Sequence, residues 1–67
     1  MLTSKLSTAL TIFASYAPAV QVEHQGNAYH IYGYPEDAFK SMTLSARSKL
    51  FSLGWCISSD GEWYLPD

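Results

Sequence analysis

The sequence predicts an α+β domain of order αββαββ, in which two helices pack on one face of a four-stranded, mainly antiparallel sheet. Two segments carry apolar residues at three- and four-residue intervals, which is the helical period. Each is followed by two β-prone segments joined by a short turn that contains glycine, which is typical of a hairpin. The 67 residues suit a single domain, 1–67, and the composition marks no linker.

The first helix is predicted from an apolar stripe near the start of the sequence. The members of the stripe are Leu2, Leu6, Ala9, Leu10, Phe13 and Ala17. Proline disfavours helical geometry in the residue before it, so Pro18 is expected to end this helix.

The first hairpin is predicted over Val20 to Gln25 and Ala28 to Tyr34, which are rich in β-branched and aromatic residues. Gly26-Asn27 between them fits a two-residue connection. The resulting pairs are Gln21 with Tyr32, Val22 with Ile31, Glu23 with His30, and His24 with Tyr29. Because side chains alternate across a sheet, one face of this hairpin is apolar and the other is polar and aromatic.

The second helix is predicted to start at residues 35–37, where a proline and two carboxylates suit a first helical turn. A break is expected near Ser41 to Thr43, and the main segment is Leu44 to Leu53. Gly54 then provides the left-handed residue that ends a helix. The side chains expected to be buried in part are Leu44, Ala46, Leu50, Phe51 and Leu53.

The second hairpin is predicted over Trp55 to Ser59 and Glu62 to Leu65, with Asp60-Gly61 forming a type I′ turn. The pairs in this register are Ser58 with Trp63, Ile57 with Tyr64, and Cys56 with Leu65. One face then carries Cys56, Trp63 and Leu65, and the other carries Trp55, Ile57 and Tyr64. We expect Trp63 in the core and Trp55 on the outer face of the sheet.

The candidate binding surface is the sheet face that the helices leave uncovered. Its predicted residues are His30, Tyr32, Trp55 and Tyr64. Aromatic residues make up 15% of the chain and charged residues only 15%, so an unusual share of the surface must be uncharged. Exposed aromatic patches are typical of contact sites, and tyrosine and tryptophan are enriched at interface hot spots.

The charge balance disfavours general binding to nucleic acid. The formal net charge is −2, because six acidic residues outnumber the four basic ones. The basic residues are Lys5, Lys40, Arg47 and Lys49. The lone Cys56 cannot form an internal disulfide, which favours a reducing compartment and a cytoplasmic location. Residues 1–19 have the outline of a secretory signal, but polar residues interrupt the apolar run, which is also too short and too polar to span a membrane.

No arrangement of residues in the sequence indicates catalysis or a cofactor. Nucleophilic catalysis needs a cysteine or serine beside a histidine and an acid, and neither such a motif nor a glycine-rich phosphate loop occurs. His24 and His30 are predicted on opposite faces of the first hairpin, so they cannot share a metal ion. We therefore expect no enzyme activity, no cofactor and no metal site.

The segment Ala46 to Pro66, ARSKLFSLGWCISSDGEWYLP, resembles a small domain of unknown function found in phage, plasmid and DNA-processing proteins. That domain has a helix, then Leu-Gly, a short acidic turn and Trp-Tyr-aliphatic-Pro. The matching residues here are Leu53, Gly54, Trp63, Tyr64, Leu65 and Pro66. The resemblance implies a phage or mobile-element setting and does not imply an activity.

The leading hypothesis is a small non-enzymatic protein-binding module whose partner is another protein or a second copy of the chain. The resemblance adds the expectation of an accessory protein that binds and inhibits a host macromolecule. The alternative is a single-stranded nucleic-acid-binding module, in which Tyr32, Trp55 and Tyr64 stack on bases. The three basic residues between positions 40 and 49 would then have to contact the backbone, although they are predicted on a helix that covers the other face.

Overall fold

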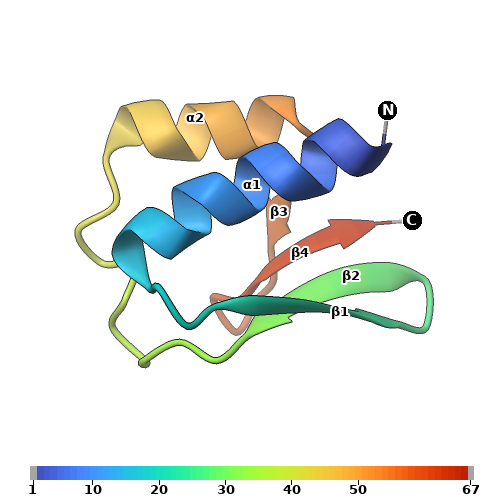
Figure 1. Ribbon diagram of the computed structural model, residues 1–67, viewed down its shortest axis with the longest axis horizontal. Helices are drawn as coiled ribbons and strands as arrows, with labels where there is room; N and C mark the ends of the chain where they lie inside the picture. Colours follow the sequence, from blue (N-terminus) through green and yellow to red (C-terminus); the bar gives the residue numbers. More distant parts are fainter. Residues whose placement is uncertain (1, 67) are drawn as a thin grey trace.

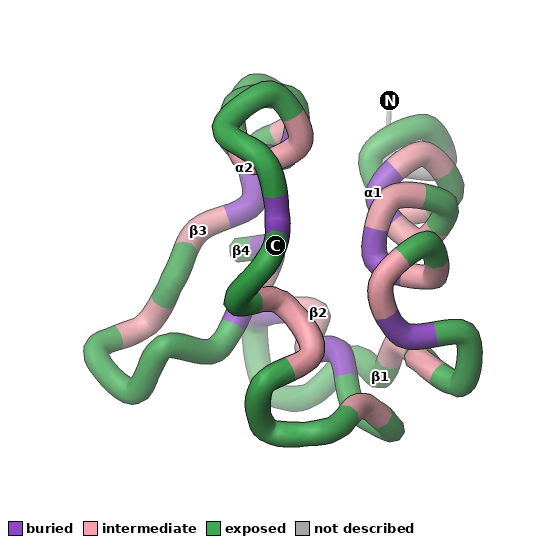
Figure 2. The backbone as a smooth tube through the Cα atoms, turned by 90° about the vertical axis from the view of Figure 1, so that its left-hand side faces the viewer, coloured by how far each residue is buried: buried purple, intermediate pink, exposed green. Residues whose placement is uncertain are grey.

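The observed elements follow the predicted order, and the α+β fold class is confirmed. The computed structural model describes residues 2–66, with side chains described from residue 4 onward. The elements are α1 (Leu2–Tyr16), β1 (Gln21–Gln25), β2 (Ala28–Tyr32), α2 (Leu44–Ser52), β3 (Cys56–Ile57) and β4 (Trp63–Pro66). Every strand pair is antiparallel, and the four strands lie in the order β1-β2-β4-β3. Figures 1 and 2 show both helices on the same side of this sheet.

The α1 helix buries the stripe that its sequence predicts. Ala9, Phe13 and Ala17 are buried, and the buried positions of α1 lie on its side toward α2 and the sheet (Figure 2). Leu2, the first predicted member of the stripe, lies outside the residues whose side chains are described. The helix ends before Pro18, as predicted, and the Ala17 amide donates a hydrogen bond to the Phe13 carbonyl at 2.8 Å.

Strands β1 and β2 pair in the predicted register. The pairs are Gln21 with Tyr32, Val22 with Ile31, Glu23 with His30, His24 with Tyr29, and Gln25 with Ala28. Gly26 has a φ of +62° and Asn27 does not have a positive φ, which is the pattern of a type II′ turn. An added Cβ at Gly26 would meet nothing within 4 Å, so glycine is needed here for its backbone conformation and not for space.

The segment before α2 forms turns, so the prediction of a helix start at residues 35–37 is wrong. The amides of Ala38, Lys40 and Met42 donate to the carbonyls of Pro35, Asp37 and Phe39 at 3.0 to 3.2 Å. These are i→i+3 bonds, which form tight turns and not an α-helix. The side chain of Met42 is buried and connects the end of this segment to the core.

The α2 helix begins after Thr43, whose Oγ1 accepts a hydrogen bond from the Ala46 amide at 3.1 Å. Leu50 is completely buried, whereas Leu44 is 79% exposed and does not contribute to the core as predicted. Helical geometry explains the difference, because Leu44 is seven residues before Phe51 and shares its flank of the helix, away from Leu50. Phe51 is accordingly half exposed.

The second hairpin has a different register from the predicted one. Ile57 lies opposite Trp63, and Cys56 lies opposite Tyr64, which is a shift of one residue. The Ser58 amide donates to the Glu62 carbonyl at 2.8 Å, so the loop has three residues, 59–61. Gly61 has a φ of +82°, and no described non-glycine residue has a positive φ, so the predicted type I′ turn is wrong. The loop is the three-residue type with a left-handed glycine at its last position.

The shift of one residue moves Trp55 from the predicted outer face to the core. A one-residue slip exchanges the two faces of a strand, so Trp55 now shares the inner face with Trp63 and Leu65. Only 1% of the Trp55 surface is exposed, and its Nε1 donates a hydrogen bond to the Lys5 carbonyl in α1 at 3.0 Å. The burial of Trp63 is as predicted, whereas the prediction that Trp55 is exposed is wrong.

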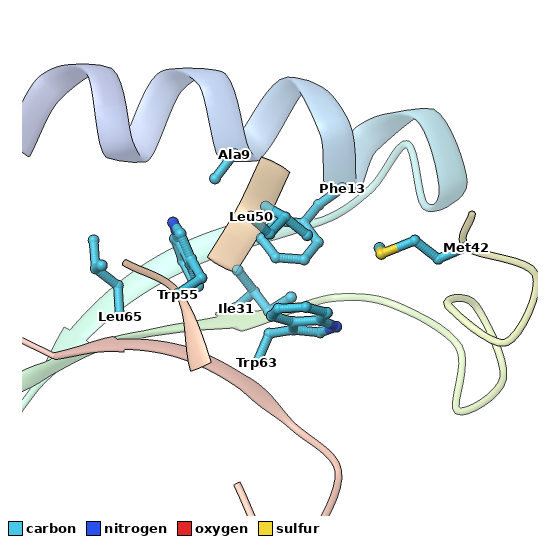
Figure 3. Packing of buried hydrophobic residues seen from close by; sticks show 8 residues of the cluster. All are labelled: Ala9, Phe13, Ile31, Met42, Leu50, Trp55, Trp63 and Leu65. Carbon is cyan, nitrogen blue, oxygen red and sulfur yellow. The ribbon is translucent and has the colours of Figure 1, made fainter. Parts of the chain in front are cut away.

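One cluster with many aromatic rings forms the core between the helices and the sheet. Figure 3 shows its buried members, which are Ala9, Phe13, Ile31, Met42, Leu50, Trp55, Trp63 and Leu65. The centroid of the Phe13 ring lies 5.2 Å from that of Trp55 and 5.8 Å from that of Trp63, both in edge-on contacts. Such aromatic pairs add about 0.5–1.5 kcal/mol beyond the area they bury. Large rings therefore allow a short chain to build a core from few residues.

Candidate protein interface on the outer face of the sheet

The outer face of the sheet is the side that points away from both helices (Figure 1). Because Trp63 and Leu65 point toward the helices, alternation places Tyr64 on the other side, together with its partner His30. The first-hairpin register places every second residue of β1 and β2 there as well. The register of the second hairpin places Cys56, predicted on the inner face, opposite Tyr64 on the outer face. The side chains that define the outer face are Gln21, Glu23, Gln25, His30, Tyr32, Cys56, Glu62 and Tyr64.

Polar and ring contacts organise the outer face. The His30 and Tyr64 rings are stacked, with an interplanar angle of 26° and 6.3 Å between their centroids. The Tyr32 hydroxyl donates a hydrogen bond to Oε1 of Gln21 at 3.0 Å, across the pair that the two residues form in the ladder. Tyr32 nevertheless keeps 45% of its surface exposed. The aromatic side chains are therefore held in place and still accessible.

A shallow hollow of about 360 Å³ lies on this face. Its lining residues are Glu23, Gln25, His30, Tyr32 and Glu62. The side-chain amide of Gln25 donates a hydrogen bond to the Glu23 carboxylate. Among the described residues, two carboxylates and no lysine or arginine line the hollow, so its electrostatic field favours a cationic group.

The structure brings three of the four predicted site residues together and separates the fourth. His30, Tyr32 and Tyr64 lie on adjacent strands of the outer face. Trp55 is buried on the opposite side of the sheet and cannot contact a partner at this face. The register of the first hairpin predicted the positions of His30 and Tyr32, and the error in the second hairpin misplaced Trp55.

A second accessible region lies beside α2 and β3, where the sequence predicted none. Leu44, Phe51 and Ile57 are exposed there, and a hollow of about 310 Å³ lies next to Ile57 and Trp63. Tyr34 also lines this hollow, and burial together with the negative charge of Glu62 raises the pKa of its hydroxyl. The seven-residue spacing of Leu44 and Phe51 was the sequence signal for an apolar helix flank.

The part of the chain that the structure describes holds no group of three or more histidine, cysteine or acidic residues arranged for a metal ion. His24 and His30 point to opposite faces of the first hairpin, as their register predicted. Neither helix, within residues 2–66, has the length and apolar character needed to cross a membrane.

Comparison with known proteins gives no assignment for this chain. No family model, no curated protein and no solved structure matches it. The resemblance of residues 46–66 to a phage and plasmid domain therefore stays a prediction, and a functional proposal rests on the geometry of the two accessible surfaces.

Proposed function

We propose that this chain is a small non-enzymatic protein-binding module that uses the outer face of its sheet. The observation that carries the proposal is an uncovered sheet face with ordered, accessible aromatic side chains, above all Tyr32 and the stacked pair of His30 and Tyr64. Tyrosine offers a large contact area at a low cost in conformational entropy, and it is enriched at the energetic centres of protein interfaces.

The charges of the outer face indicate the kind of partner. Glu23 and Glu62 lie beside Tyr32, and no lysine or arginine lies among the described residues of this face. Carboxylates next to aromatic rings favour a protein surface that presents lysine or arginine side chains, through ion pairs and cation–π contacts. The same carboxylates repel phosphate groups, so the single-stranded nucleic-acid alternative is the less favoured one.

The biological setting of the proposal comes from the resemblance in residues 46–66. In that setting the chain is a phage or mobile-element accessory protein that binds a host protein and inhibits it. A homodimer formed through the outer face is the other form of the same proposal, because self-association uses the same exposed rings.

Site-specific photo-crosslinking tests the proposal. A photoreactive phenylalanine analogue replaces Tyr32 or Tyr64, and in a matched control it replaces the exposed Ser7 of α1. Crosslinking is carried out in the cell that produces the protein. We expect defined protein adducts from positions 32 and 64 and none from position 7. Adducts of twice the chain mass would identify the homodimer.

A binding measurement completes the test. For a partner identified in this way, Tyr64→Ala should weaken the affinity by about 2 kcal/mol, the loss typical of a hot-spot tyrosine. Circular dichroism should show that the variant stays folded. The absence of adducts at both outer-face positions, together with a monomer at micromolar concentration, would count against the proposed function.

A further inference from the structure

A second surface, on the side of α2 and β3, combines exposed apolar side chains with cations. Leu44, Phe51 and Ile57 are 79%, 50% and 44% exposed, and they are three of the four large apolar side chains that are exposed in the described part of the chain. We call the region of Lys40, Leu44, Arg47, Phe51 and Ile57 the α2–β3 surface. Clustered exposure of large apolar side chains is typical of an interaction site.

The members of the α2–β3 surface are contiguous through the edge of Trp63. The ring centroids of Phe51 and Trp63 are 5.2 Å apart, and Ile57 lies directly opposite Trp63 in the sheet. Arg47, Ile57 and Trp63 together line the hollow of about 310 Å³. Leu44 lies about two helical turns before Phe51 on the same flank of α2, so it extends the apolar surface along the helix.

The charges around this surface have the opposite sign to those of the outer face. Among the described residues, Lys40, Arg47 and one carboxylate, that of Glu36, line the hollow, and the charge of Glu62 also reaches the Tyr34 hydroxyl there. Two cations therefore line this hollow, although the chain as a whole has a net charge of −2. This local excess of positive charge determines which partner the surface favours.

We propose that the α2–β3 surface docks an acidic segment of a partner protein, in which carboxylates flank large aliphatic or aromatic side chains. The apolar side chains of the segment cover Leu44 and Phe51 and enter the hollow beside Ile57. Its carboxylates pair with Lys40 and Arg47 at the rim, where charge complementarity supplies specificity and a fast association rate. This surface is separate from the outer face, so either proposal can fail alone.

Selection from a displayed library of random peptides tests this proposal while the partner is still unidentified. We expect the immobilised chain to enrich peptides that combine aspartate or glutamate with leucine or phenylalanine. The affinity of a synthetic peptide of the enriched sequence should fall about tenfold or more on Leu44→Ser or Arg47→Glu, as for hot-spot residues. Salt should weaken its binding as well.

Two matched variants act as controls. Lys5→Glu removes a cation on α1, and Tyr32→Ala alters the outer face, so both should bind the peptide with unchanged affinity. Circular dichroism should show the native fold for Leu44→Ser, since Leu44 is largely exposed. If Arg47→Glu does not fold, Lys40→Glu replaces it, because Lys40 is exposed in the turns before α2.

Several outcomes would overturn the proposal. One is the absence of enriched peptides, and another is enrichment of basic or uncharged peptides. Peptide binding that persists in the Arg47→Glu variant would also refute it. Saturable binding of oligothymidylate that Arg47→Glu abolishes, without binding of acidic peptides, would assign the surface to nucleic acid. If sedimentation analysis shows a dimer, and Leu44→Ser dissociates this dimer, the α2–β3 surface would be assigned to contact with a second copy of the chain.

Discussion

At the scale of single residues, Trp55 has a role that its sequence neighbours do not reveal. Its ring is packed against Phe13, and its indole N–H donates to the Lys5 carbonyl, 50 positions earlier in the chain. The sequence predicted that one of the two tryptophans faces inward, and Trp63 does so. The burial of Trp55 depends on the register of β3 and β4 and on a hydrogen bond between distant residues, neither of which is visible in the local pattern.

The Trp55→Ala substitution should reduce the free energy of unfolding by about 3–5 kcal/mol, because it leaves a large cavity beside Phe13. A loss of this size is comparable to the whole stability of a small domain. Trp55→Phe keeps most of the apolar area and loses the bond to Lys5, so it should cost distinctly less. Urea unfolding, with Tyr64→Ala as an outer-face control, measures both effects. A stable, folded Trp55→Ala variant would contradict the burial of this ring.

Tyr34 should make the stability depend on alkaline pH. Burial and then the nearby charge of Glu62 raise the pKa of its hydroxyl above the ordinary value of 10.0, because both disfavour the phenolate. The neutral form is thus preferred in the folded state. Its stabilising contribution is complete below the unfolded pKa and is lost as pH rises through the folded pKa.

The comparison of wild type with Tyr34→Phe measures this contribution. Unfolding by urea should show wild type losing more stability than the variant between about pH 9 and pH 11. The NMR shift of the Tyr34 Cζ should report a raised pKa that falls toward the ordinary value in Glu62→Gln. Identical pH profiles for the two proteins would show that Tyr34 ionises equally in the folded and unfolded states.

At the scale of elements, the two hairpins show where local sequence specifies a turn and where it does not. Gly26-Asn27 forms the expected two-residue turn, with the whole ladder in the predicted register. Asp60-Gly61 also favours a two-residue turn, but the hydroxyl of Ser58 accepts hydrogen bonds from the amides of Asp60 and Glu62, both at 3.2 Å. This local side-chain interaction stabilises a three-residue loop, and the longer loop places both tryptophans on the inner face.

Substitutions in this loop distinguish the two turn types. Gly61→Val should cost about 1–2 kcal/mol, because Gly61 has a φ of +82° and a β-branched residue resists that conformation. Asp60→Val should change the stability by less than about 0.5 kcal/mol, since Asp60 does not have a positive φ and is exposed. Thermal melting of both variants measures the two losses. A type I′ turn needs a positive φ at both Asp60 and Gly61, so equal losses in the two variants would show that the loop is the two-residue turn after all.

At the scale of the whole molecule, the sequence predicted the layers better than the surfaces. Helical periodicity and β-prone segments predicted the element order, because each element has its own local pattern. The main segment of the second helix was predicted to begin at Leu44, as α2 does, whereas the helix start predicted at residues 35–37 is absent. The exposed flank with Leu44 and Phe51 was missed, because it depends on which side of α2 packs against the core. In the candidate site, the positions of Tyr32 and His30 were predicted correctly because the register of the first hairpin was correct. The position of Trp55 was predicted wrongly because the turn of the second hairpin was wrong.

The core also predicts how the whole chain unfolds. Trp55 contacts Phe13 of α1 at a ring distance of 5.2 Å, and Trp63 contacts both Phe13 and Phe51 of α2 at 5.8 and 5.2 Å. Because one cluster joins both helices to the sheet, no hairpin or helix retains a core of its own after the cluster opens. We expect a single cooperative transition.

The two tryptophans allow this expectation to be measured at two places in the core. In Trp55→Phe the fluorescence reports Trp63 beside α2, and in Trp63→Phe it reports Trp55 beside α1. Within each variant, the midpoint from fluorescence should coincide with the midpoint from far-ultraviolet circular dichroism, which follows all the helices and strands. A fluorescence transition that precedes the loss of circular dichroism in either variant would show that the core opens while a helix or hairpin persists. Coincident curves in both variants would show that the helices and the sheet are stable only together, because they share one set of buried rings.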